Sequence, residues 1–225
     1  MQINLPVQVL LLSVLAAGTS YLLGSLSFAI IITRLFAHRD IRDSGSGNAG
    51  MTNVLRTVGP FPAALTLLGD ILKSVAAIYF SRWLFSFVPV SYAARLGMFL
   101  GSIFVLLGHI FPIFFGFRGG KGVLTCAGIF FMLDWQLALV SLAAFLLVTF
   151  LSGYVSLGSI VALALAPIST LVAGLTFRAD PLPQVLWQAG FVLILAGISI
   201  LMHHENIRRL KNGTENRFSR KQKKS

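Results

Sequence analysis

The sequence predicts an all-α, polytopic integral membrane protein with seven transmembrane helices. Apolar residues make up 56% of the 225 residues and charged residues only 11%, and the mean hydropathy is +0.84. This composition is typical of a membrane protein and not of a soluble globular one. Apolar stretches recur along the whole chain, so no separate soluble domain is expected. We expect one membrane-embedded domain, residues 1–225, that ends in a basic cytoplasmic tail, residues 208–225.

Seven apolar segments are assigned as the crossings, because about 20 residues of helix span the hydrocarbon core. They are residues 5–33, 61–80, 96–115, 122–133, 135–151, 154–177 and 185–202. The fourth is short for a full crossing. The first begins without basic residues and is too long for the apolar part of a cleaved signal peptide, so we expect it to stay as an anchor. The uncharged run 135–177 must turn once, and Ser152-Gly153-Tyr154 is the expected turn.

The basic residues predict the orientation of the chain. Seven crossings bring residues 34–56, residues 117–122 and the tail to one side, where they hold 14 Lys and Arg. The other side has three, Arg82, Arg95 and Arg178. Such an excess marks cytoplasmic loops, so we expect the N-terminus outside and the tail inside. If the fourth segment were re-entrant and did not cross, the tail would lie on the opposite side of the membrane from residues 34–56.

The net charge of +11 comes largely from the tail, since eight of the 18 basic residues lie between Arg208 and Lys224. No soluble domain presents this charge, so a nucleic-acid partner is not expected and anionic membrane lipid is. The single cysteine, Cys126, excludes an intramolecular disulfide and is assigned to packing. His203 and His204 are adjacent and lack a suitably spaced third ligand, so no metal site is expected.

A polar, glycine-rich segment, SGSGNAGMTNVLR at 44–56, interrupts the apolar sequence. Its glycines permit positive φ and close approach of the backbone to a ligand, and successive amides in such a loop form a concave anion site. The candidate binding residues are Gly45, Ser46, Gly47, Asn48, Gly50, Thr52 and Asn53. Arg56 adds a planar fork that suits phosphate or carboxylate. The alternative is a flexible interfacial loop that leads into the second helix.

A second cluster combines GHIFP at 108–112 with FRGGKG at 117–122. A helix that starts after glycines and a lysine favours phosphate, although the spacing of a P-loop is absent. The candidate residues are His109, Gly119, Gly120, Lys121 and Gly122. The alternatives are a turn with a topology-setting lysine and a hydrogen-bonded structural histidine.

Two pairs of residues complete the candidates. His203 and Asn206, at the cytoplasmic end of the last helix, are three residues apart and share a helix face. Asp70 and Lys73 are also three apart, inside an apolar helix. Ionisable residues within a membrane are functional candidates by default, but we favour a charge-neutral structural pair here.

Five segments of the sequence occur in an order and spacing that are specific when taken together. They are Gly24-Ser25, GSGNAGMTNVLR at 45–56, GHIFPIFFGFRGGKG at 108–122, YVSLGS at 154–159 and HHENIRRLKNGTE at 203–215. Over essentially the whole chain they resemble the bacterial PlsY family of integral-membrane acyl-phosphate:glycerol-3-phosphate acyltransferases. Departures are small. Met51 and Leu124 stand where alanine is common in that family, and His204 stands where arginine is common.

The resemblance implies one acyltransferase domain that works without a cofactor. A fatty acyl group would pass from acyl phosphate to the sn-1 hydroxyl of glycerol 3-phosphate, giving 1-acyl-glycerol 3-phosphate (lysophosphatidic acid) and phosphate. This is an early step of phospholipid biosynthesis. The expected location is the bacterial cytoplasmic (inner) membrane, with the active site on the cytoplasmic side. Contact with other phospholipid-synthesis enzymes is compatible with this role.

The candidate residues acquire roles from this resemblance. Ser46 and the amides of its loop would hold a phosphate as ligands, and Arg56 and Lys121 would bind and neutralise phosphate. His203 and Asn206 would position glycerol 3-phosphate. No carboxylate in the motifs suits a general base, and the resemblance implies that the donor's own phosphate accepts the hydroxyl proton. A conventional base role for His203 stays open.

Two other functions compete with this interpretation. A phosphate-ester transporter would share the helices and the anion site, but it needs a polar path through the outer half, where few polar residues occur. An acyltransferase that uses thioester donors would employ His38 and Asp43, which fit the HxxxxD pattern of glycerolipid acyltransferases. That two-residue match in a basic loop is a weak signal.

Overall fold

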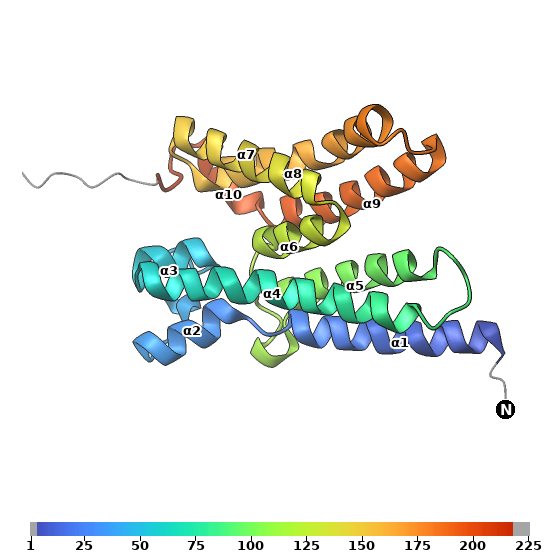
Figure 1. The fold of residues 1–225 in the computed structure, drawn as a ribbon. Coiled ribbons are helices and arrows are strands. Elements are labelled where there is room, and N and C mark those ends of the chain that lie inside the picture. Colours follow the sequence, from blue (N-terminus) through green and yellow to red (C-terminus); the bar gives the residue numbers. More distant parts are fainter. Residues whose placement is uncertain (1–3, 218–225) are drawn as a thin grey trace, which may run out of the picture. The chain divides into compact units, whose positions relative to one another are not determined.

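The computed structural model of the protein describes residues 4–217, and every regular element in that range is a helix (Figure 1). In chain order they are α1 (Leu5–Gly24), α2 (Phe28–Ala37), η1 (Ile41–Asp43), α3 (Met51–Thr57), α4 (Pro60–Phe85), α5 (Ala93–Ile110), η2 (Ile113–Phe115), α6 (Val123–Leu133), α7 (Trp135–Ser152), α8 (Val155–Val172), η3 (Ala173–Phe177), α9 (Leu182–Leu201) and α10 (His204–Lys211). Within the described range, six helical segments are long and apolar enough to cross a membrane, and α6 is a shorter apolar helix of 11 residues. The predicted all-α, polytopic membrane fold is confirmed.

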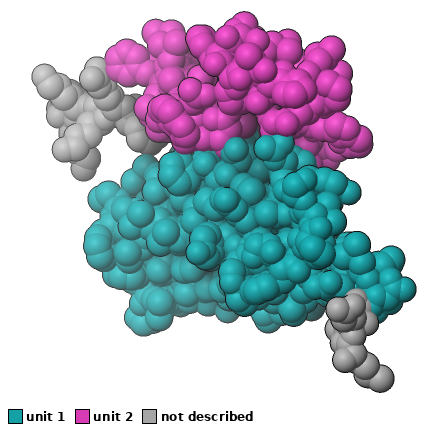
Figure 2. Space-filling view, turned by 45° about the vertical axis from the view of Figure 1, so that its right-hand side comes forward, with its two compact units in different colours: residues 1–133 teal, residues 134–225 magenta. Residues whose placement is uncertain are grey.

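The chain divides into two compact units, Met1–Leu133 and Asp134–Ser225, which Figure 2 colours separately. The first unit contains α1–α6, and the second contains α7–α10. Of the predicted basic tail, residues 208–211 belong to α10. Residues 218–225 lie outside the described part of the chain.

Small residues let α1, α4 and α5 of the first unit pack closely against one another (Figure 1). A Cβ added at Gly24 of α1, or at Gly108 of α5, would collide with the backbone of the other helix. The buried hydroxyls of Ser20 and Ser81 lie 3.0 Å apart and join α1 to α4. In a membrane, apolar side chains pack equally well against lipid and against another helix. Close backbone contact and buried hydrogen bonds therefore hold the helices together.

The first predicted crossing, 5–33, is not one helix, because α1 ends at Gly24 and α2 starts at Phe28. Ser25 Oγ donates to the carbonyl of Tyr21 at 2.8 Å, and the Leu26 carbonyl in the break accepts from Lys73 Nζ of α4 at 2.8 Å. A break within the membrane needs such partners, because lipid offers none. The apolar sequence alone gave no sign of it, since the partner of Leu26 lies far along the chain.

The second unit begins with the antiparallel pair α7 and α8. Gly153 ends α7 with φ +77°, which glycine adopts without strain, so the predicted turn at 152–154 is confirmed. At the other end of α7, Arg178 forms ion pairs with Asp134 and with Asp180, the latter at 2.8 Å. This cluster ties the start of α7 to the segment that joins η3 to α9.

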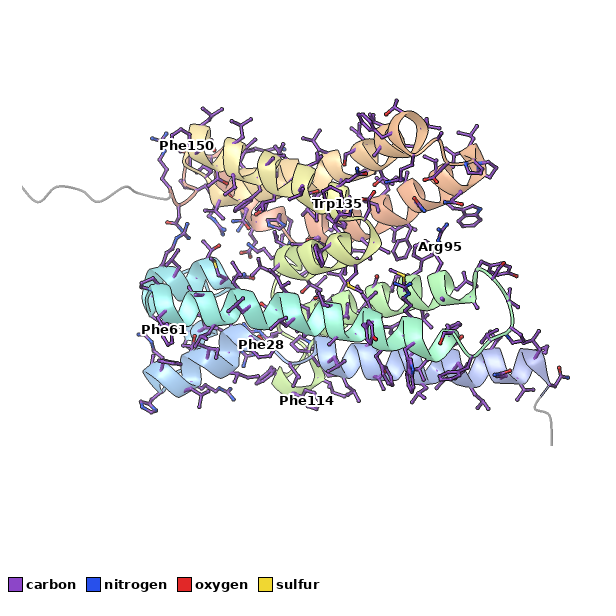
Figure 3. The ribbon with its side chains drawn as sticks, in the orientation of Figure 1. Phe28, Phe61, Arg95, Phe114, Trp135 and Phe150 are labelled. Atoms are coloured by element: carbon purple, nitrogen blue, oxygen red, sulfur yellow. The ribbon has the colours of Figure 1, made fainter. Side chains whose placement is uncertain are left out.

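Large apolar side chains cover the outside of the helices. Phe61, Phe114 and Phe150 are 63%, 56% and 77% exposed, and Figure 3 shows them at the outer surface of their helices. Contiguous apolar surface of this kind is costly in water but favourable against lipid. The side chains therefore agree with the helix lengths in indicating a membrane environment.

Candidate active site

Segment 44–56, here named loop 44–56, consists of an irregular part, 44–50, and most of α3, and it folds around one side chain, that of Asn53. This amide is 2% exposed, and its Nδ2 donates to the carbonyls of Ile41, Ser44 and Asn48 at 3.2, 2.9 and 3.1 Å. Its Oδ1 accepts from the backbone N–H of Ser46 at 3.0 Å. A buried amide with all these partners fixes the backbone around it. Asn53 therefore organises the loop from within.

The glycines and the polar residues of this loop differ in exposure. Gly45 and Gly47 adopt φ of +60° and +70°, and a Cβ at Gly45 would meet the Asn53 side chain. Both glycines and Ser46 are exposed, whereas Asn48 and Thr52 are half-buried. Gly50 precedes α3, and its carbonyl accepts from the N–H of Asn53 and of Val54. Arg56 lies exposed in the last turn of α3.

Arg42 joins this region to loop 117–122, a link that sequence reasoning missed because Arg42 was counted only for topology. Its Nε and one terminal nitrogen each lie 2.9 Å from the oxygens of Asp40. The other terminal nitrogen donates to the carbonyls of Phe115 and Arg118 at 2.6 and 3.2 Å. The hydrogen bonds from Arg42 hold the pKa of Asp40 well below its usual range. The Asp40–Arg42 ion pair therefore stays ionised, and Arg42 links the two loops through its hydrogen bonds.

Loop 117–122 folds back on the end of α5. The N–H groups of Gly119 and Gly120 donate to the carbonyls of Ile110 and His109 at 3.1 and 3.2 Å. A Cβ at the buried Gly120 would collide with His109 Nε2 and with the carbonyl oxygen of Ala49. Loops 44–56 and 117–122 therefore meet at Gly120, which needs to be glycine for this contact.

Three residues after this contact, at Val123, the chain enters α6. Lys121 is half-buried, and Gly122 follows it with φ +85° and accepts from the N–H of Cys126 at 2.7 Å. His109 is buried, with its Nδ1 3.0 Å from Lys73 Nζ. The predicted candidates of both loops thus lie in one region of the first unit.

The remaining candidates, His203 and Asn206, lie in the second unit. His203 Nδ1 is 2.8 Å from the carbonyl oxygen of Ser199, so Nδ1 carries a proton. Asn206 Nδ2 donates to Glu215 Oε1 at 2.7 Å, and Ser156 Oγ donates to the same oxygen at 2.8 Å. Arg209 Nε donates to the other carboxylate oxygen at 2.7 Å.

Glu215 was quoted within a motif but not singled out from the sequence. Burial raises its pKa, yet the hydrogen bonds from Arg209, Asn206 and Ser156 together outweigh burial, so the pKa lies below its usual range. The carboxylate is therefore ionised near neutral pH. By accepting this hydrogen bond, it fixes the orientation of the Asn206 amide.

We expect Glu215→Gln to destabilise the protein at pH 7 and to have little effect at low pH. The pKa in the folded protein lies below the reference value of 4.5. The stabilisation is therefore fully present above that value and is lost as the pH falls through the folded pKa. Thermal unfolding at several pH values measures this difference. Glu205→Gln is the control, because that side chain is 56% exposed and lies 3.5 Å from Arg209. Equal effects of both variants at pH 7 would contradict the assignment.

The structure also bears on the His38 and Asp43 pattern and on metal binding. His38 lies exposed at the end of α2 and Asp43 lies exposed in η1, and within residues 4–217 no ion pair joins them. Among the described residues, no group of three His, Cys, Asp or Glu is arranged to hold a metal ion.

Known proteins resemble this chain over most of its length. The family model for glycerol-3-phosphate acyltransferase matches residues 14–213. A glycerol-3-phosphate acyltransferase of Nitrobacter winogradskyi is 43% identical, with 92% of this chain and 96% of that protein covered. The corresponding protein of Clostridioides difficile is 40% identical over the same shares of the two chains.

Solved structures agree with the sequence relatives. The crystal structure of PlsY (YgiH), an integral membrane glycerol 3-phosphate acyltransferase, in its glycerol 3-phosphate form has a TM-score of 0.78 at 34% identity. The alignment covers 92% of this chain and 96% of that one. The lysophosphatidic acid form of that enzyme gives a TM-score of 0.76 at 33% identity. The chain therefore belongs to the PlsY-type family of membrane glycerol-3-phosphate acyltransferases.

Proposed function

We propose that the protein transfers a fatty acyl group from acyl phosphate to the sn-1 hydroxyl of glycerol 3-phosphate, giving 1-acyl-glycerol 3-phosphate and phosphate. One observation supports this most strongly. Within the first unit, loop 44–56, which ends at Arg56, meets loop 117–122, which contains Lys121. Glycine backbone and basic side chains are the groups that bind phosphate, and both proposed substrates carry phosphate.

The chemistry requires little covalent participation by the protein. The hydroxyl oxygen of glycerol 3-phosphate attacks the acyl carbon, and the bond from that carbon to the phosphate oxygen breaks. The leaving phosphate takes up the hydroxyl proton. Acyl phosphate is already activated, so catalysis consists of holding the reactants together and neutralising charge. Ser46 acts as a ligand in this scheme and forms no acyl-enzyme.

The side chains divide into ligands and supports. Arg56 and Lys121 neutralise phosphate, and the exposed amides and hydroxyl of loop 44–56 hold it. The sequence alone placed Asn53 among the phosphate ligands. Because its side chain is buried and bonded to the loop backbone, we assign it to holding the loop in shape. His203 and Asn206 position glycerol 3-phosphate, with Glu215 orienting the Asn206 amide. The remaining proposed ligands are Gly45, Gly47, Asn48, Gly50, Thr52, His109, Gly119, Gly120 and Gly122.

His203 offers a second route for the proton. Because its Nδ1 donates to the Ser199 carbonyl, Nε2 is the acceptor of the neutral ring. If His203 were the base, kcat would fall as the pH drops and the ring becomes protonated. If the leaving phosphate accepts the proton instead, His203→Gln and the wild type should show the same pH profile of kcat.

We place the protein in the bacterial cytoplasmic membrane with its active site on the cytoplasmic side. The excess of Lys and Arg in residues 34–56, residues 117–122 and the tail supports this orientation. The acyl chain would then lie in the hydrocarbon region, among the apolar helices. Cysteine accessibility at position 212, near the start of the tail, tests the orientation, and labelling from the outside alone would contradict it.

The choice of donor tests the proposed reaction. Purified protein in proteoliposomes receives glycerol 3-phosphate with acyl phosphate, acyl-CoA or an acyl carrier protein thioester, and lysophosphatidate is measured. We expect product from acyl phosphate alone, and His38→Ala should retain near-normal activity. Product from acyl-CoA but not from acyl phosphate, together with an inactive His38→Ala, would favour the thioester mechanism. Flux of glycerol 3-phosphate across the vesicle without acylation would favour a transporter.

A further inference from the structure

We propose that the buried pair Asp70 and Lys73 is a positioning device for the active site. Lys73 holds the His109 ring in the tautomer with the proton on Nε2, and that ring sets the position of the turn at Gly119-Gly120, next to Lys121. The inference rests on the phosphate-binding role proposed above for Lys121. It assigns a function to an intramembrane ion pair that the proposed reaction does not otherwise use.

The first step is the set of partners around Lys73. Its Nζ lies 2.8 Å from Asp70 Oδ1, 2.8 Å from the carbonyl oxygen of Leu26 and 3.0 Å from His109 Nδ1. An ammonium group donates hydrogen bonds and accepts none, so Nζ donates to the Leu26 carbonyl and to His109 Nδ1, while its contact with Asp70 Oδ1 is an ion pair. His109 Nδ1 must then accept a hydrogen bond, and the proton of the neutral ring is on Nε2.

The second step is burial. Asp70, Lys73 and His109 are only 1%, 4% and 4% exposed, so water does not compete for these contacts. The pair lies on α4 and reaches both the break between α1 and α2 and the end of α5. Replacing a buried ion pair by apolar residues is often neutral for stability, so the need to fold does not by itself explain why this pair is present.

The third step leads from His109 to the loops. The carbonyl of His109 accepts from the N–H of Gly120 at 3.2 Å, and its ring lies where a side chain of Gly120 would be. The Ala49 carbonyl lies against the same position, so this is where loops 44–56 and 117–122 meet. A rotated or differently protonated ring would displace Gly120, and Lys121 follows it directly.

The test replaces both charges at once, as Asp70→Leu with Lys73→Met, so that no unpaired charge is left buried. We expect acyl transfer per folded molecule to fall about 10- to 100-fold, because displacements of around 1 Å have that effect on positioned groups. In a Lys121→Ala background the same double replacement should cause little further loss, since both changes act through Lys121. The matched control is Ser20→Ala with Ser81→Ala, which removes another buried polar pair of the same unit and should keep near-normal activity.

Nitrogen-15 histidine spectra of the full-length protein in nanodiscs provide a readout independent of activity. Subtraction of the His109→Gln spectrum assigns the ring, and we expect an unprotonated Nδ1 and a protonated Nε2 in the wild type. A wild-type ring protonated at Nδ1 would overturn the proposal even if the double variant failed to fold. A folded double variant with near-normal activity would also overturn it. If the wild type itself did not use acyl phosphate, the proposed reaction would fail while the tautomer measurement still decided the role of Lys73.

Discussion

Arg56→Ala and Lys121→Ala are each expected to lower kcat/KM for acyl transfer by about 10²- to 10³-fold, the loss typical of removing a preorganised charge-stabilising group. Arg56 lies exposed at the end of loop 44–56, and Lys121 lies in the loop that meets it. Both proposed reactants carry phosphate, and bringing two anions together without these cations is unfavourable. Initial rates with purified variants, corrected for the folded fraction, measure the effect.

Arg82→Ala is the matched control for these two variants. Arg82 is also an exposed arginine of the first unit, but it lies in the last turn of α4, which we place at the outer face. It should keep near-normal rates. If Arg56→Ala or Lys121→Ala turned over at a similar rate, the phosphate-binding role of that residue would be wrong.

Asn53→Ala is expected to have the second largest effect, through the shape of loop 44–56. The substitution removes the donor to three backbone carbonyls and the acceptor for the N–H of Ser46. A buried polar group left without its partner costs about 1–3 kcal/mol, so both stability and activity should fall. We expect acyl transfer to decline at least about tenfold, because a disordered loop no longer presents its amides in one geometry.

The control for this prediction is Ser44→Ala. That change shortens a side chain of the same loop but keeps the carbonyl that accepts from Asn53 at 2.9 Å. It should leave thermal unfolding and activity nearly unchanged. If Asn53→Ala kept full activity and only lowered the unfolding temperature, Asn53 would matter for stability alone, and the loop would not need its fixed shape.

The sequence predicted the helices well, because their signal is local. Each apolar segment is largely helical, although α5 ends at Ile110, before the expected bound of 115, and Gly153 ends α7 at the expected turn. The division of 5–33 into α1 and α2 was missed. The partner that makes this break tolerable, Lys73, lies 47 residues from Leu26, and no periodicity connects the two.

The candidate residues were also predictable by type but not by role. Glycines and basic side chains revealed where anions could bind, yet Asn53 turned out to be buried within the loop instead of exposed on it. Arg42 and Glu215 were missed because each acts through contacts with residues far away in the sequence, such as Phe115 and Ser156. Such long-range side-chain contacts follow from tertiary packing, which local patterns do not encode.

Phosphorus-31 NMR of the complete reaction tests the central claim most directly. Proteoliposomes containing the purified protein receive acyl phosphate and glycerol 3-phosphate, and the signals of both substrates, lysophosphatidate and inorganic phosphate are followed together. The account predicts that one lysophosphatidate and one phosphate form for each acyl phosphate consumed, and that Lys121→Ala slows the appearance of both products in parallel. Release of phosphate without lysophosphatidate, or lysophosphatidate formed only when acyl-CoA replaces acyl phosphate, would contradict it.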